Sequence, residues 1–109
     1  MNIVLNNNKT RYVRIFCLED LDNIHETFRK ISSMKGPLEV KIYSINESIT
    51  INKLSKLKNH LENLNVISLS IYSNDRKTIL AGKSLKIYST FLKEQEVKNK
   101  LLLFDPVLN

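Results

Sequence analysis

Apolar positions in the middle of the chain follow a strand pattern, then a helix pattern, then a strand pattern again. Leu38, Val40 and Ile42 alternate with charged residues, as in a half-buried strand. Leucines recur at spacings of three and four over residues 54–64, which predicts a helix, and the apolar residues 66–72 predict a second strand. A strand, a crossover helix and a strand within about 35 residues form a βαβ unit, so we expect the two strands to be parallel.

The residues before this unit predict a hairpin and a helix. Apolar stretches over residues 3–5 and 11–17 are separated by the polar residues 6–10, a pattern typical of a β-hairpin. An apolar stripe over residues 21–31 predicts an amphipathic helix. Pro37 prevents that helix from continuing, because a proline pushes the preceding residue out of helical geometry.

The residues after the unit are expected to form a further helix, opened by residues 73–75, and a short last strand within residues 85–88. The predicted fold class is α/β, with a small mixed sheet that starts with the N-terminal β-hairpin and continues with alternating helices and strands, in the order ββαβαβαβ. We expect residues 1–89 to form a single α/β domain. Residues 90–109 are expected to be a tail or linker, with three readings open: an edge strand, a docked arm, or the start of a connection to a C-terminal domain absent from this chain. Within it, an edge strand at residues 101–104 would let two copies pair as a homodimer.

The sequence lacks the residue patterns on which enzymes and metal sites depend. The glycines, Gly36 and Gly82, are too few for a phosphate-binding loop. Cys17 is the single cysteine, and neither His25 nor His60 has a partner at metal-ligand spacing. We therefore predict that the chain is no enzyme, has no metal site and needs no cofactor.

Charge and hydropathy narrow the class of partner. The 17 lysines and arginines outnumber the 11 aspartates and glutamates, and the net charge of +6 favours an acidic partner. These cations are scattered and are not interleaved with aromatic residues, so we predict no nucleic-acid partner.

No stretch approaches the roughly 20 apolar residues of a membrane span. The N-terminus lacks the pattern of a signal peptide, and we expect a cytoplasmic location.

Segments along nearly the whole chain follow the pattern of one family. They are Ile3–Leu5, Tyr12–Ile15, Gly36–Ile42, Asn65–Ser73, Ile79–Ile87 and Leu101–Asn109. They resemble strands, a helix and the linker of the N-terminal domain in the MinC family of bacterial septum-site-determining proteins. The family usually carries a glycine near the tip of its first hairpin, where this chain has asparagines.

The resemblance implies inhibition of cell division without chemistry. In this family the N-terminal domain binds the tubulin-like protein FtsZ and antagonises its polymers, which restricts septum placement. The C-terminal domain dimerises and binds the membrane ATPase MinD, so any link to the membrane would be indirect. Lys30 stands at the place of a family lysine that contacts FtsZ. Lys35, Asn7 and Asn8 are further partner-binding residues that the resemblance implies.

Two other functions compete with this one. A STAS-like regulatory protein-binding module would carry a phosphorylatable serine at a helix start. Ser48 and Ser44 are candidates, although the Asp-Ser step typical of such modules is absent. A basic nucleic-acid-binding domain is the second alternative, and its binding would weaken steeply with salt because phosphate contacts release counterions.

Overall fold

The chain alternates strands and helices along its length. The structure, a computed structural model, describes residues 2–5, 11–16, 21–33 and 37–103; residues 2–5, 11–16 and 101–103 are described by their backbone alone. The elements are β1 (Asn2–Leu5), β2 (Arg11–Phe16), α2 (Ile24–Ser32), β3 (Leu38–Ser44), α3 (Ile51–Leu61), β4 (Val66–Ser73), α4 (Arg76–Ser84), β5 (Tyr88–Phe91) and α5 (Glu94–Leu103).

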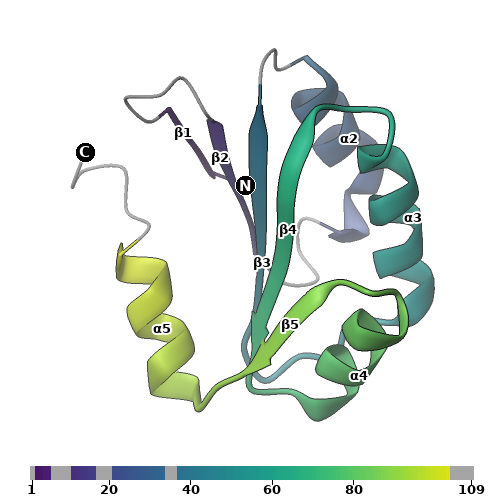
Figure 1. Ribbon diagram of the computed structural model, residues 1–109. Coiled ribbons are helices and arrows are strands. Elements are labelled where there is room, and N and C mark those ends of the chain that lie inside the picture. The colour runs from purple at the N-terminus through teal and green to yellow at the C-terminus, as the bar shows by residue number, and fades with distance from the viewer. Residues whose placement is uncertain (1, 6–10, 17–20, 34–36, 104–109) are drawn as a thin grey trace.

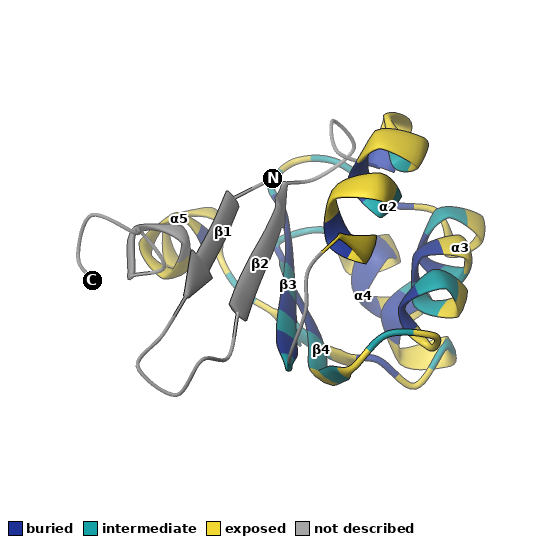
Figure 2. Cartoon of the chain, turned by 90° about the horizontal axis from the view of Figure 1, so that it is seen from above, coloured by how far each residue is buried: buried dark blue, intermediate teal, exposed yellow. Residues whose placement is uncertain are grey.

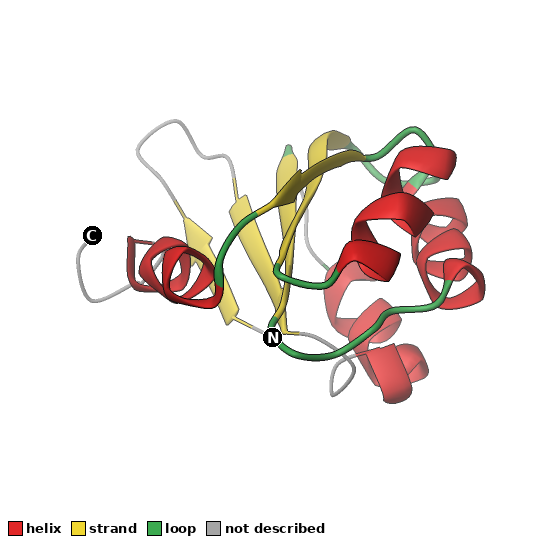
Figure 3. Ribbon diagram, turned by 90° about the horizontal axis from the view of Figure 1, so that it is seen from below, coloured by secondary structure: helices red, strands yellow, loops and turns green. Residues whose placement is uncertain are grey.

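The strands form one five-stranded sheet in the order in which they follow along the chain. β1 and β2 pair antiparallel, and each later pair of neighbours is parallel. Each parallel pair is joined through a helix, because the chain must return to the start of the next strand. Because the strand order never reverses, the crossover helices α2, α3 and α4 all lie on one face of the sheet. α5 lies on the other face (Figures 1 and 3).

The core lies between the sheet and the layer of α2, α3 and α4 (Figure 2). Alternate residues of β3 point to this face, and all of them are buried, as the period of a strand requires. Burying each large aliphatic side chain contributes about 1.5–3 kcal/mol. The core members from β3 and α3 are Leu38, Val40, Ile42, Leu54, Leu57 and Leu61.

On the other face, α5 packs against β3 and β4. Val97 is fully buried in α5. The Lys100 ammonium lies 5.2 Å from the centre of the Tyr72 ring, which stacks on Tyr43 at a centroid distance of 5.5 Å. Between Glu94 and Lys100, the helix therefore meets the sheet through one buried apolar side chain and a contact between a cation and an aromatic ring.

Gly82 lets α4 approach the sheet closely. A Cβ atom at this position would lie 2.2 Å from the Ser89 hydroxyl oxygen of β5 and 2.8 Å from Cδ1 of Ile71 in β4. Both distances are shorter than van der Waals contact, so a larger residue would push α4 away from the strands. The close packing of α4 against β5 thus requires glycine at position 82, because glycine has no side chain.

The structure confirms a mixed α/β fold and the parallel pairing of β3 with β4. The predicted order ββαβαβαβ does not match the whole chain, because α5 follows the last strand. β1 and β2 pair as the predicted hairpin requires, but its connecting residues 6–10 lie outside the described residues, so the hairpin itself is not described. The predicted edge strand at residues 101–104 is wrong for Leu101–Leu103, which belong to α5, and a homodimer through it loses its basis.

Candidate functional site

Lys30 lies in the last turn of α2 and has about half of its side chain exposed. Its ammonium is 3.9 Å from the Glu26 carboxylate. Arg29 already holds that carboxylate through hydrogen bonds of 3.1 Å from Nε and 2.6 Å from Nη2. The hydrogen bond from Arg29 lowers the pKa of Glu26, and the same bond raises the pKa of Arg29. Lys30 therefore forms the weaker ion pair of the two cations with Glu26, and its charge is available to a partner.

The other predicted partner-binding residues lie outside the described residues. Lys35 falls between α2 and β3, and Asn7 and Asn8 fall between β1 and β2. The structure therefore neither joins these residues to Lys30 nor separates them from it. Their roles stay predictions.

The carboxyl ends of β3 and β4 are the place where parallel sheets commonly bind ligands. Asn46 and Asn74 lie there and form two hydrogen bonds with each other. The Asn46 backbone N–H donates to Asn74 Oδ1 at 2.8 Å, and Asn74 Nδ2 donates to Asn46 Oδ1 at 2.7 Å. The side-chain amide of Asn46 also donates to a Glu94 carboxylate oxygen at 3.2 Å. These polar groups bond one another and connect both strand ends to α5, so they hold loops in place instead of presenting a free set of ligands.

The serines of the STAS-like alternative have structural partners. Ser44 is buried, and its hydroxyl donates to the carbonyl oxygen of Glu47 at 2.5 Å. The hydroxyl of Ser48 donates to a carboxylate oxygen of Asp75 at 2.9 Å. Both hydroxyls hold the loop that leads into α3, and burial keeps Ser44 away from a kinase.

Asp75 caps the N-terminus of α4. One of its carboxylate oxygens accepts from the Thr78 backbone N–H at 2.8 Å, from the Thr78 hydroxyl at 2.8 Å and from the Ser48 hydroxyl. Burial raises the pKa of Asp75, but these hydrogen bonds and the charge of Lys77 lower it by more, so the net pKa lies below its ordinary value. The ionised cap therefore stabilises the fold.

Asp75→Asn is expected to reduce the loss of unfolding free energy that acid pH causes. A depressed pKa contributes stability above the unfolded-state value of about 3.9, and that stability is lost as the pH falls through the folded-state pKa. Asparagine still caps a helix but does not titrate. Urea unfolding from about pH 6 to about pH 2 should show a smaller loss of unfolding free energy for the variant. Parallel curves for the two proteins would contradict this role of Asp75.

The described residues include no group of three or more histidines, cysteines, aspartates or glutamates placed to hold a metal ion. His60 has a packing role: its ring stacks on Phe28 at a centroid distance of 4.0 Å, and Nε2 lies 2.9 Å from the Ser32 hydroxyl. These contacts join α3 to α2. Across the described part of the chain, no helix is long and apolar enough to cross a membrane.

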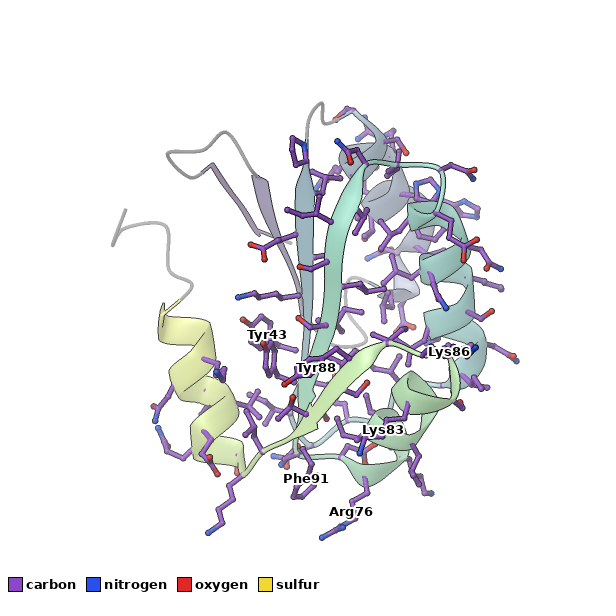
Figure 4. The ribbon with its side chains drawn as sticks, in the orientation of Figure 1. Tyr43, Arg76, Lys83, Lys86, Tyr88 and Phe91 are labelled. Carbon is purple, nitrogen blue, oxygen red and sulfur yellow. The ribbon has the colours of Figure 1, made fainter. Side chains whose placement is uncertain are left out.

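A surface that the sequence did not predict lies where α4 runs along β5 (Figure 4). Exposed apolar side chains alternate with cations on it. We call it the α4–β5 surface and define it by Arg76, Leu80, Lys83, Lys86 and Phe91.

The α4–β5 surface has a definite geometry. The guanidinium carbon of Arg76 lies 4.7 Å from the centre of the Phe91 ring, a cation–π contact. Beside this pair is a hollow of about 200 Å³, lined by Arg76, Ile79, Leu80, Lys83 and Phe91. Leu80 is 67% exposed, and Phe91 is 43% exposed. Contiguous exposed apolar side chains rimmed by charges are typical of interaction sites.

Sequence spacing could have indicated this surface. Arg76, Leu80 and Lys83 follow at i, i+4 and i+7, which places them on one face of a helix. Cations on both sides of an apolar residue at helical spacing were the available signal for an exposed face.

Comparisons with known proteins indicate a family. No family model and no solved structure matches the chain. A protein of Prochlorococcus marinus subsp. pastoris, named as a probable septum site-determining protein MinC, is 36% identical over 106 residues. The match covers 97% of this chain and 48% of that protein, so the chain spans about half the length of the curated relative it matches. The chain is thus related to the septum site-determining protein MinC along almost its whole length, which confirms the resemblance that its sequence indicated.

Proposed function

We propose that the chain is the N-terminal domain of a MinC-type cell-division inhibitor, which binds FtsZ and antagonises its polymers without catalysing a reaction. The observation that carries this proposal is the identity of 36% to a septum site-determining protein over almost the entire chain. The length of that relative, about twice that of the match, is what a second domain would require. In the longer protein, that second domain would bind MinD and link this cytoplasmic domain to the membrane indirectly.

Electrostatics support contact with a partner surface at α2. The chain carries a net charge of +6, which accelerates encounter with an acidic surface and orients it. Lys30 is exposed at the C-terminal end of α2, and its nearest carboxylate is already held by Arg29. We propose Lys30 as a contact residue, with Lys35, Asn7 and Asn8 as further contacts.

Lys30→Glu is expected to weaken inhibition of FtsZ assembly. The substitution reverses the charge at the proposed contact, and losing one partner of a charge pair that is buried and hydrogen-bonded in an interface costs about 2 kcal/mol or more, roughly a 30-fold loss of affinity. The measurement is the mass of FtsZ polymer sedimented with GTP, titrated with wild-type or variant domain. Lys56→Glu, which changes an exposed lysine of α3 in the same way, is the matched control.

The outcomes separate the site from the function. If the wild-type domain leaves polymer mass unchanged, the inhibitor proposal fails. If Lys30→Glu inhibits as well as the wild type, Lys30 is no contact while the function stands. Equal losses in both variants would mean that net charge matters and position does not.

A further inference from the structure

β5 is an edge strand with one free side. It is the last strand of the sheet, and its only neighbour among the described strands is β4. The Leu92 N–H donates to the Ser73 carbonyl oxygen at 2.9 Å, toward β4. Because backbone groups alternate along a strand, the N–H and C=O groups of Ser89 and Phe91 point away from β4. They are positioned to pair with another strand.

The side chains of β5 do not protect this edge. Proteins guard an edge strand by keeping it very short or with lysine, proline, a bulge or a covering segment, and of these β5 has its short length of 4 residues. β5 reads Tyr88-Ser89-Thr90-Phe91 and contains neither a charge nor a proline. Tyr88 is 69% exposed at one end of the strand, and Phe91 is exposed at the other.

α4 supplies a row of side chains beside the edge. Arg76 lies against Phe91, and Leu80 and Lys83 follow along the helix toward the start of β5 (Figure 4). Leu80 and Phe91 share the hollow of about 200 Å³, which has room for one aliphatic side chain. A strand added to β5 would therefore place every second side chain along this row.

The positive charges beside the free edge of β5 favour an acidic strand as its partner. Arg76, Lys77, Lys83 and Lys86 are exposed, and none of them has a carboxylate within ion-pair distance among the described residues. Asp75, the acidic residue next to Arg76 in sequence, is engaged as the cap of α4. A second copy of this chain, with its own charge of +6, would be repelled.

We propose that the α4–β5 surface is a second partner-binding site, which takes an extended acidic peptide segment of a partner protein as an added strand on β5. Backbone hydrogen bonds to Ser89 and Phe91 would supply affinity, and alternate side chains would supply specificity. An apolar side chain fills the hollow beside Leu80, and carboxylates reach Arg76 and Lys83. The site does not depend on FtsZ: it lies on α4 and β5, whereas Lys30 is on α2, and α3 packs between these helices.

The test measures binding of a fluorescein-labelled peptide in which glutamate and valine take turns at every second position, with serine between them, so that both face the α4–β5 surface. We expect saturable binding to the wild-type domain that weakens as salt is added, because exposed charges are screened. The double variant Leu80→Asp/Lys83→Glu should raise the dissociation constant by at least about tenfold, a loss of about 1.4 kcal/mol. Lys56→Glu, on the exposed side of α3, should leave it nearly unchanged. Both variants change surface residues, and circular dichroism checks that they fold.

Two altered peptides and one backbone measurement identify the mode of binding. A peptide N-methylated at every residue cannot donate a backbone hydrogen bond from either edge and should not bind, and a lysine–valine peptide should not bind either. Hydrogen exchange at the Ser89 and Phe91 amides should slow when the glutamate–valine peptide is bound. Absence of saturable binding, equal binding of the N-methylated or lysine peptide, or unchanged exchange at both amides would each overturn the proposal.

Discussion

Leu54→Ala is expected to lower the free energy of unfolding by about 3 kcal/mol, because it empties a closed part of the core. Leu54 lies in α3 with none of its surface exposed, in the cluster that α3 forms with the strands. Total stability of a small domain is about 5–15 kcal/mol, so this loss is a large fraction of it. The melting temperature should fall by roughly 12 °C, and urea unfolding gives the free energy directly.

Leu80→Ala is the matched control for this prediction. The same atoms are removed, but Leu80 is largely exposed on α4, and alanine is at least as good a helix former. Its effect should stay within about 0.5 kcal/mol of zero. Similar losses for the two variants would show that the helix layer does not pack on the sheet as described.

Thr78→Val is expected to cost about 2 kcal/mol although the side chain keeps its shape, because a buried backbone donor loses its partner. Thr78 is fully buried, and its hydroxyl oxygen accepts the Ile49 backbone N–H at 2.9 Å. The same hydroxyl donates to the Asp75 carboxylate at 2.8 Å. Valine offers neither bond, so the segment before α3 and the cap of α4 lose a shared support. Urea unfolding of the variant against the wild type measures the difference.

Thr78→Ser separates the hydrogen bonds from the packing. Serine keeps the hydroxyl and removes a methyl group, so it should cost about 1 kcal/mol, the value of one buried carbon. If serine proves as costly as valine, the hydroxyl has no special role. Hydrogen exchange at the Ile49 amide should be slow in the wild type and the serine variant and faster in the valine variant, which would report the hydrogen bond from Ile49 to the hydroxyl.

The βαβ unit could be predicted because its pattern is continuous. The first three alternate residues of β3 are apolar, and Leu54, Leu57 and Leu61 mark one face of α3. The end of the helix could not be placed as well. Leu64 continues the helical spacing, yet α3 ends at Leu61, and Leu64 reaches the core from a turn in which its N–H bonds the Leu61 carbonyl. Apolar spacing records which residues are buried, and a turn can bury a leucine as a helix does.

The C-terminal part was harder to predict for two physical reasons. Leu85 and Ile87 contact the core from the connection before β5, so their apolar character placed the predicted strand too early. Lys86 between them has φ 60°, a left-handed conformation that a lysine rarely adopts and that no propensity indicates. In α5, Val97 is the one apolar residue before Leu101, so the charged residues around it favoured a tail.

The candidate sites differ in what the sequence could indicate. The family resemblance pointed to Lys30, and the structure shows this side chain exposed and loosely paired. The α4–β5 surface depends on β5 being the outermost strand and on α4 lying beside it. Strand order is a property of tertiary pairing, so the sequence could indicate the exposed face of α4 but not that β5 is the outermost strand beside it.

The sheet order has a consequence for how the domain folds. The strands are neighbours in the order in which they are synthesised, so no later segment has to insert between two strands already paired. Loops closed in folding are then short, and their entropic cost is low, because it rises with the number of residues enclosed. A chain of this topology is suited to fold strand by strand as it leaves the ribosome, with β5 joining after the rest of the sheet.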